Sequence, residues 1–159
     1  MAGDLPRDRN ETKITDLKET KGRILGVDFG DTRTGLAVSD IGRFLASGIG
    51  YVSPGGIEKT ADHVAEVARA QKAGAVVVGL PKNMDGSEGF RAERCREFAA
   101  LLGQRLEGVP IAMIDERLTT MSASRYLNET NTRGSRRKGV IDTLSAEIIL
   151  QNALDRLKH

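Results

Sequence analysis

The sequence predicts one α/β domain built on a mixed five-stranded sheet flanked by helices. Three observations predict it. Short apolar runs separated by turn residues open the domain, strand patterns then alternate with helical patterns, and 159 residues with 39% hydrophobic content suffice for one core. The opening runs predict an antiparallel three-strand meander, and the alternation predicts two parallel strands reached by right-handed crossovers.

The meander and the first helix are distinguished by a change in apolar period. The three strands of the meander are expected at residues 23–27, 35–39 and 44–52. Apolar residues then recur at steps of three and four from Ile57 to Ala68, which predicts an amphipathic helix with Gly74 as its C-terminal cap. The run "AVVVG" at residues 75–79 predicts a strand buried on both faces.

The second half of the chain predicts the remaining helices, one more strand and a basic loop. The next helix is expected to turn five side chains to the core: Phe90, Cys95, Phe98, Leu101 and Leu102. A strand follows at residues 111–114, and Thr119 or Thr120 can cap a short helix. The stretch "NETNTRGSRRKG", residues 128–139, has no apolar residue and predicts a mobile loop before a last helix at about residues 140–157.

Composition narrows the classes of function. Lys and Arg number 24 against 22 Asp and Glu, so the net charge of +2 demands neither a nucleic-acid nor a membrane partner. Residues 1–20 are polar with charges of both signs, so we expect a disordered N-terminal tail, no signal peptide, and one domain at residues 21–159. No apolar run reaches membrane-spanning length, and the single cysteine, Cys95, fits a reducing compartment, so the expected location is the cytoplasm.

Histidine is nearly absent from the chain. With only His63 and His159, a Ser-His-Asp triad or a Cys/His zinc site is hard to build. Chemistry in this protein must therefore use carboxylates, hydroxyls or lysines.

Three acidic residues stand at the ends of predicted elements. Asp28 ends the first strand, Glu116 follows a later strand in "DERLTT", and Asp142 lies in the expected first turn of the last helix. Ligands gather at the carboxyl ends of strands in such sheets, so Asp28 and Glu116 are expected at one edge. Asp142 joins them if its helix packs closely, which the small side chains of Ser145 and Ala146 on the same helix face permit.

Three carboxylates in one place repel each other, so a divalent cation is their natural partner. Mg²⁺ or Mn²⁺ takes oxygen ligands, and one or two such ions can activate a water and stabilise a leaving oxygen at a phosphodiester. Taken singly, each acid also has a structural interpretation: Asp28 as a turn residue, Glu116 as a solvated or ion-paired acid, and Asp142 as a carboxylate favoured at a helix start.

Four sequence blocks carry a resemblance to a known family. "GVDFGDTRTGLAVSD", "VVVGLPKNMDGSEG", "DERLTT" and "IDTLSAEIILQNALD" resemble, in order and spacing, the blocks of the YqgF family. Its members are described as Holliday junction resolvases and as nucleases that mature the 5′ end of the small-subunit ribosomal RNA precursor. The resemblance implies a ribonuclease H-like fold and a metal-dependent nuclease in which Asp28, Glu116 and Asp142 are catalytic and hold the metal.

Further residues are expected to contact the substrate. Arg33, in the turn after Asp28, is a candidate phosphate contact, although it can equally be a solvated turn residue. The long turn "LPKNMDGSEG" offers Lys82, Asn83 and Ser87 as donors to a nucleic-acid backbone. The basic run "RGSRRK" offers three more cations, Arg136, Arg137 and Lys138, or is only a solvated face.

The expected partner is nucleic acid, either structured RNA or branched DNA, and the chain is expected to act as a monomer or a homodimer. Two other functions remain open at this point. The chain could be a non-catalytic nucleic-acid-binding factor in ribosome biogenesis, or a fragment of an actin-like ATPase, whose first strand also ends in an aspartate before a phosphate loop. Cleavage of nucleic acid would favour the nuclease, and nucleotide binding without nucleic acid would favour the ATPase.

Overall fold

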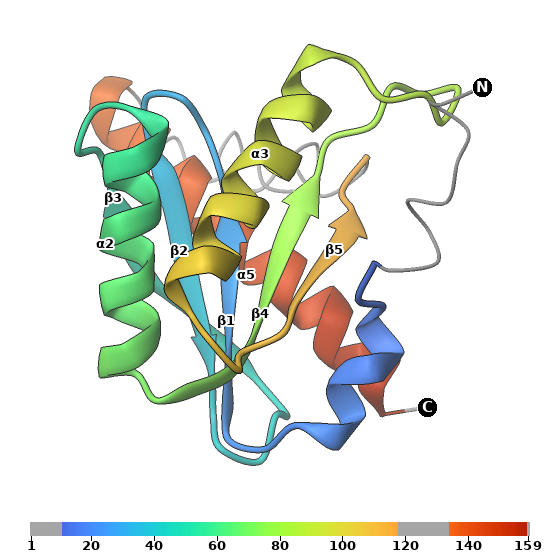
Figure 1. Ribbon diagram of the computed structural model, residues 1–159. Coiled ribbons are helices and arrows are strands. Elements are labelled where there is room, and N and C mark those ends of the chain that lie inside the picture. Colours follow the sequence, from blue (N-terminus) through green and yellow to red (C-terminus); the bar gives the residue numbers. More distant parts are fainter. Residues whose placement is uncertain (1–10, 118–133, 159) are drawn as a thin grey trace.

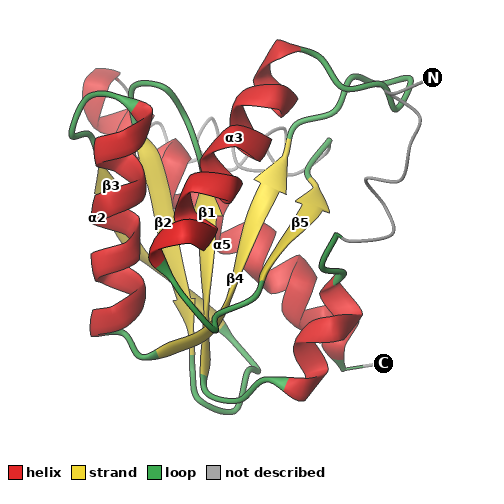
Figure 2. Cartoon of the chain, in the orientation of Figure 1, coloured by secondary structure: helices red, strands yellow, loops and turns green. Residues whose placement is uncertain are grey.

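The fold is a five-stranded mixed sheet covered by helices on both faces (Figures 1 and 2). The computed structural model describes residues 11–117 and 134–158. For residues 134–138 it describes the backbone but not the side chains. The strand order is β3-β2-β1-β4-β5, with bounds β1 Arg23–Asp28, β2 Thr34–Ser39, β3 Ala46–Val52, β4 Ala73–Leu80 and β5 Ile111–Asp115. The β1–β2 and β2–β3 pairs are antiparallel, and the β1–β4 and β4–β5 pairs are parallel. The predicted architecture is confirmed.

Two apolar cores lie on opposite faces of the sheet. Helices α2 (Ile57–Ala70) and α3 (Phe90–Arg105) cover one face, where they pack on Leu25 and Val27. The long helix α5 (Gly134–Leu157) and the short 3-10 helix η2 (Ile14–Glu19) cover the other, as Figure 1 shows. Strands covered on both faces have apolar interiors, which is why residues 24–27 of β1 and 75–80 of β4 form continuous runs without a polar side chain. Among the helices in residues 11–117 and 134–158, none is long and apolar enough to span a membrane.

Glycines in the strands let α5 lie unusually close to the sheet. A Cβ atom on Gly26 would stand 2.6 Å from the Cβ of Leu150, and one on Gly48 would stand 2.6 Å from Cγ2 of Thr143. The small helix residues that the sequence suggested, Ser145 and Ala146, are buried in the same contact. Close approach therefore depends on small residues on both partners.

The expected tail is partly wrong, because residues 14–19 form η2 and belong to the core. Leu17 is fully buried against the α5 face of the sheet. The guanidinium of Arg43 fixes the segment, donating hydrogen bonds to the carbonyl oxygens of Gly22 (2.7 Å) and Leu17 (2.9 Å) and to Oγ1 of Thr20 (2.8 Å). A six-residue 3-10 helix with two buried apolar residues gives too short a pattern to be read as periodic.

Leu17→Ala is expected to lower the free energy of unfolding by about 2–4 kcal/mol, because it leaves a cavity among fully buried side chains. Thr15→Ala, on the exposed side of the same turn, should change it by less than about 0.5 kcal/mol. Urea unfolding of both variants measures the difference. Equal midpoints would mean that η2 is dispensable for the core.

Two predictions about helix ends and faces are wrong. Gly74 is a residue of β4 rather than a cap, and a Cβ there would overlap the carbonyl oxygen of Lys21. The residue with left-handed backbone at the end of α2 is Lys72, with φ 56°. Phe90 is 70% exposed because it occupies the first position of α3, while Cys95 and other residues further along the helix form its buried face.

The last helix starts earlier than predicted. It begins at Gly134, so residues 134–139 are helical rather than part of a loop. Gly139 is buried, and a Cβ on it would stand 2.6 Å from Cε1 of Tyr51, so the helix backbone packs directly on that ring. The short helix expected after Thr119 or Thr120, and the predicted loop residues 128–133, lie outside the described residues.

Candidate functional site

Asp28 stands at the end of β1, where the neighbouring strand leaves room for α5. Its cross-strand partner in β2 is Gly35. Because side chains alternate along a strand, Asp28 lies on the same face as Gly26, which is the face that α5 covers. A Cβ on Gly35 would overlap the carbonyl oxygen of Asp142, so this glycine places the backbone of α5 beside Asp28.

Glu116 reaches the same place from the other side. It follows β5, its N–H donates to the carbonyl oxygen of Leu80 (3.2 Å), and its side chain is 95% buried. A Cβ on Gly79 would overlap Oε2 of Glu116, so the carboxylate lies over that glycine of β4. Gly79 follows Val78, which pairs with Val27 of β1, so the carboxylate lies over the strand next to Asp28.

Asp142 lies in the third turn of α5 rather than in its first turn, which removes the interpretation as a helix-start carboxylate. Its Oδ2 accepts a hydrogen bond of 2.8 Å from Nε of Arg33, and the two side chains form a half-buried ion pair. The structure thus brings together the three acids predicted from the sequence, and it pairs one of them with the predicted phosphate contact.

The electrostatics of the site show how closely the acids interact. Burial first, and then the negative charge of Asp142, raise the pKa of Asp28 to about 7 against a lowering effect of Arg91. Burial, and then the charge of Asp28, raise the pKa of Glu116 to about 8. Burial also raises the pKa of Asp142, while its hydrogen bond with Arg33 opposes that rise. These carboxyl groups lack enough positive charge around them to stay ionised easily.

The donor chemistry of the site fits a hard divalent cation, since all three side chains offer carboxylate oxygens. As the side chains lie, no three Asp, Glu, His or Cys residues within the described part of the chain are placed to ligate one ion. Asp142 is turned to Arg33 instead. Holding an ion with all three acids would require Asp142 to exchange this arginine for the metal.

The expected donors of the β4–α3 turn are mostly occupied within the turn. Nδ2 of Asn83 donates to Oγ of Ser87 (2.9 Å), and that hydroxyl donates to Oδ1 of Asp85 (2.5 Å). Lys82 is half-buried, and its charge lowers the pKa of Asp115. The side chains of Arg136, Arg137 and Lys138 lie outside the described residues, and their backbone is helical.

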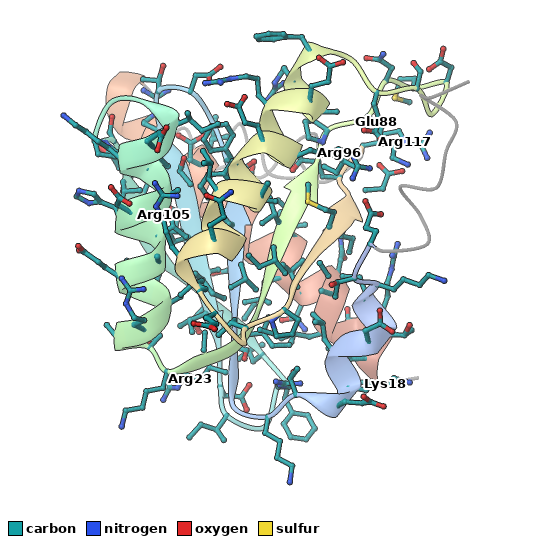
Figure 3. The ribbon with its side chains drawn as sticks, viewed as in Figure 1. Lys18, Arg23, Glu88, Arg96, Arg105 and Arg117 are labelled. Atoms are coloured by element: carbon teal, nitrogen blue, oxygen red, sulfur yellow. The ribbon has the colours of Figure 1, made fainter. Side chains whose placement is uncertain are left out.

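Sequence reasoning missed Arg91. It is the second residue of α3, it is exposed, and its positive charge lowers the pKa of both Asp28 and Glu116. Other arginines around the site are paired: Arg33 with Asp142, Arg94 with Asp31, Arg96 with Glu88 and Arg117 with Asp115 (Figure 3 labels Glu88, Arg96 and Arg117). Arg91 has neither a hydrogen bond nor an ion pair to a described residue. The available signal was its position, because the helix after β4 begins at the same sheet edge as the acids.

Comparison with known proteins gives the family. Residues 22–156 match the family described as "RuvX: Holliday junction resolvase". A protein of Acidiphilium cryptum named "Putative pre-16S rRNA nuclease" is 38% identical over 149 residues, which cover 92% of this chain and 94% of that protein. A protein of Pelotomaculum thermopropionicum with the same name is 42% identical over 134 residues, covering 84% of this chain and 86% of that one.

A solved structure supports the fold. RuvC of Thermus thermophilus, in complex with a Holliday junction substrate, superposes with a TM-score of 0.54 over 86% of this chain and 96% of that one, at 15% identity. This likeness confirms the ribonuclease H-like fold, and the family match confirms the resemblance to YqgF proteins seen in the sequence blocks. The chain belongs to the RuvX family of Holliday junction resolvases.

Proposed function

We propose that this protein is a metal-dependent nuclease that hydrolyses phosphodiester bonds, and that Asp28, Glu116 and Asp142 form its active site. The observation that carries the proposal is that Asp28 of β1 lies close enough to Asp142 of α5 and to Glu116 after β5 to interact with both charges, with the pKa values of Asp28 and Glu116 raised to about 7 and 8. Such a cluster is unfavourable unless a cation joins it. Membership of a family of nucleases supports the same activity.

The three acids would hold Mg²⁺ or Mn²⁺, which supplies an activated water and takes up negative charge at the leaving oxygen. The contribution of the protein itself is to place the acids next to one another. Gly35 and Gly79 set the acids of two other elements on either side of Asp28, and the packed α5 excludes bulk water from one side. Before the ion binds, Arg33 orients Asp142 and opposes the rise of its pKa that burial causes, because a guanidinium hydrogen bond favours the carboxylate form.

The proposed substrate is the precursor of 16S ribosomal RNA. Relatives at 38% and 42% identity, each matched over most of its length, carry the name of a pre-16S rRNA nuclease. Branched DNA is the second candidate, because the description of the matched family names the Holliday junction. The acids described at the site can bind metal and the arginines can bind phosphate. Both candidate substrates have a phosphate backbone, so these residues do not distinguish between them.

The test is a cleavage assay with Mg²⁺ and with Mn²⁺ on three substrates: a ribosomal precursor RNA, single-stranded RNA and a four-way DNA junction. Asp28→Asn should reduce the cleavage rate on the true substrate by a factor on the order of 10² to 10³ or more, as removal of a group that stabilises transition-state charge does. Asp155→Asn, an exposed acid on α5 paired with Lys158, is the matched control and should cleave normally.

Wild-type protein that binds these substrates and cleaves none of them would favour the non-catalytic binding factor. If Asp28→Asn cleaves at the wild-type rate, the carboxylates have no catalytic role. Circular dichroism of each variant shows that the fold is intact.

A further inference from the structure

A small cavity adjoins the acids on the α3 side of the sheet. Its volume is about 70 Å³, room for one phosphate group or about two waters at roughly 30 Å³ each. It is lined by the β1–β2 turn and the start of α3: Phe29, Gly30, Asp31, Arg91, Arg94 and Cys95. Phe29 directly follows Asp28 in sequence, so the cavity opens beside the proposed cleavage point.

The cavity carries one positive charge that forms no ion pair with a described residue, that of Arg91. Asp31 is neutralised by Arg94, whose Nη2 lies 2.9 Å from its carboxylate. Burial raises the pKa of Cys95 to about 12, so the thiol is uncharged at neutral pH. Phe29 stacks on Phe98, with ring centroids 4.6 Å apart, and closes the apolar side. Arg91 is left without an ion pair to a described side chain, although its charge acts on the nearby acids by lowering the pKa of Asp28 and Glu116.

An exposed aromatic residue stands next to this charge. Phe90 precedes Arg91 at the start of α3, and 70% of its surface is open to solvent. Proteins that hold single strands combine a cation for the backbone with an aromatic face for an unpaired base. In a continuous duplex the bases are already stacked inside the helix and cannot use such a face.

We propose that the start of α3 is a single-strand clamp, in which Arg91 binds a backbone phosphate at the cavity and Phe90 stacks on an unpaired base beside the cleavage point. The clamp rests on the proposed nuclease function and adds a substrate class to it. The preferred substrate has unpaired nucleotides at the cleavage point, as single-stranded ends of a precursor RNA do.

The test measures binding without metal, so that no cleavage occurs. The probes are a fluorescent 20-nucleotide RNA and the same sequence as a blunt duplex, both in EDTA over a range of salt concentrations. Arg91→Gln should weaken binding of both probes and reduce the slope of log affinity against log salt by about 0.7 for the single strand, the value for one lost phosphate contact. Phe90→Ala should weaken binding of the single strand about ten-fold, the effect of one stacked base, and leave the duplex unchanged.

Matched controls are available elsewhere on the molecule. Phe44→Ala removes a ring that is 65% exposed in the β2–β3 turn, and Lys59→Gln removes an exposed positive charge on α2. Both should bind like wild type. The clamp is overturned if Arg91→Gln keeps the salt slope of Lys59→Gln, if Phe90→Ala weakens both probes equally or neither, or if wild type binds neither probe.

These outcomes are separable from those of the proposed function. If the protein binds the probes as described but cleaves no substrate, the clamp is supported and the nuclease proposal is contradicted. If cleavage depends on Asp28 while both clamp variants bind like wild type, the nuclease proposal is supported and the clamp is contradicted.

Discussion

Asp28→Asn should unfold at a higher urea concentration than wild type at pH 8 when no metal is present. The folded protein raises the pKa of Asp28 from 3.8 to about 7, so between these values the folded state holds a proton that the unfolded state has lost. Stability therefore falls as pH rises through this window, and the loss is complete above the folded pKa. Asparagine cannot ionise and escapes the loss, which we estimate to be on the order of 2–4 kcal/mol at pH 8.

The measurement is urea unfolding from pH 4 to pH 9 in EDTA. Near pH 4 the two proteins should differ little, because the folded aspartate is then protonated. Glu116→Gln should behave in the same way, since burial and the charge of Asp28 raise the pKa of Glu116 to about 8. Asp155→Asn serves again as the control. Parallel stability profiles for wild type and Asp28→Asn would mean that Asp28 is not held in an unfavourable charged state.

Added Mg²⁺ should reverse the order of stability. A cation that binds only the folded protein stabilises it by mass action, so wild type should gain stability with Mg²⁺ concentration at pH 8. Asp28→Asn should gain much less, because it lacks one of the proposed ligands. A variant that is more stable without metal and inactive with it would show that this cluster is kept for function at the expense of stability.

Gly35→Ala is expected to be one of the two most damaging single-methyl additions to the sheet, together with Gly74→Ala. The new Cβ would overlap the carbonyl oxygen of Asp142, which is backbone in α5 and cannot rotate away. The helix must shift, so we expect a loss of about 3 kcal/mol or more in the free energy of unfolding, at the upper end for overpacking. The shift also moves Asp142 away from Asp28, so cleavage should fall even where the protein remains folded.

The control is Gly103→Ala in α3, where the nearest atom to the new Cβ is Cδ1 of Ile111 at 3.8 Å. That variant should be unchanged or more stable by about 0.5–1 kcal/mol, because alanine favours the helix. Urea unfolding and the precursor-RNA cleavage assay on both variants make the comparison. If Gly35→Ala matched Gly103→Ala in stability, the close packing of α5 on β2 would be refuted.

The sheet and the meeting of the acids could be predicted because both follow from local patterns. Strand runs fix which residues end a strand, and parallel strands present their ends at one edge, so Asp28 and Glu116 were expected together. What decides the details is contact between distant segments. The Arg33–Asp142 pair joins residues 109 positions apart, and nothing near Arg33 in the sequence distinguishes it from an arginine that faces solvent.

Other structural features could not be predicted from the sequence, for different reasons. The start of α5 consists of "GSRRKG", which has no apolar residue and therefore no period to detect. Leu17 is one of only two buried residues in the six-residue η2, which is too short a signal against a polar background. Phe90 matched the apolar pattern of α3 and was assigned to the core, although the helix begins beyond the sheet and leaves it exposed.

The packing of α5 has a consequence for how the protein is made. In sequence order α5 follows all five strands, so a nascent chain that has completed the sheet still lacks Asp142 and the helix that covers one face. A truncated product that stops before α5 would carry only two of the three acids, with an open apolar surface that invites proteolysis. If Asp142 is one of the proposed ligands, a chain that stops before α5 is therefore expected to be inactive as well as unstable.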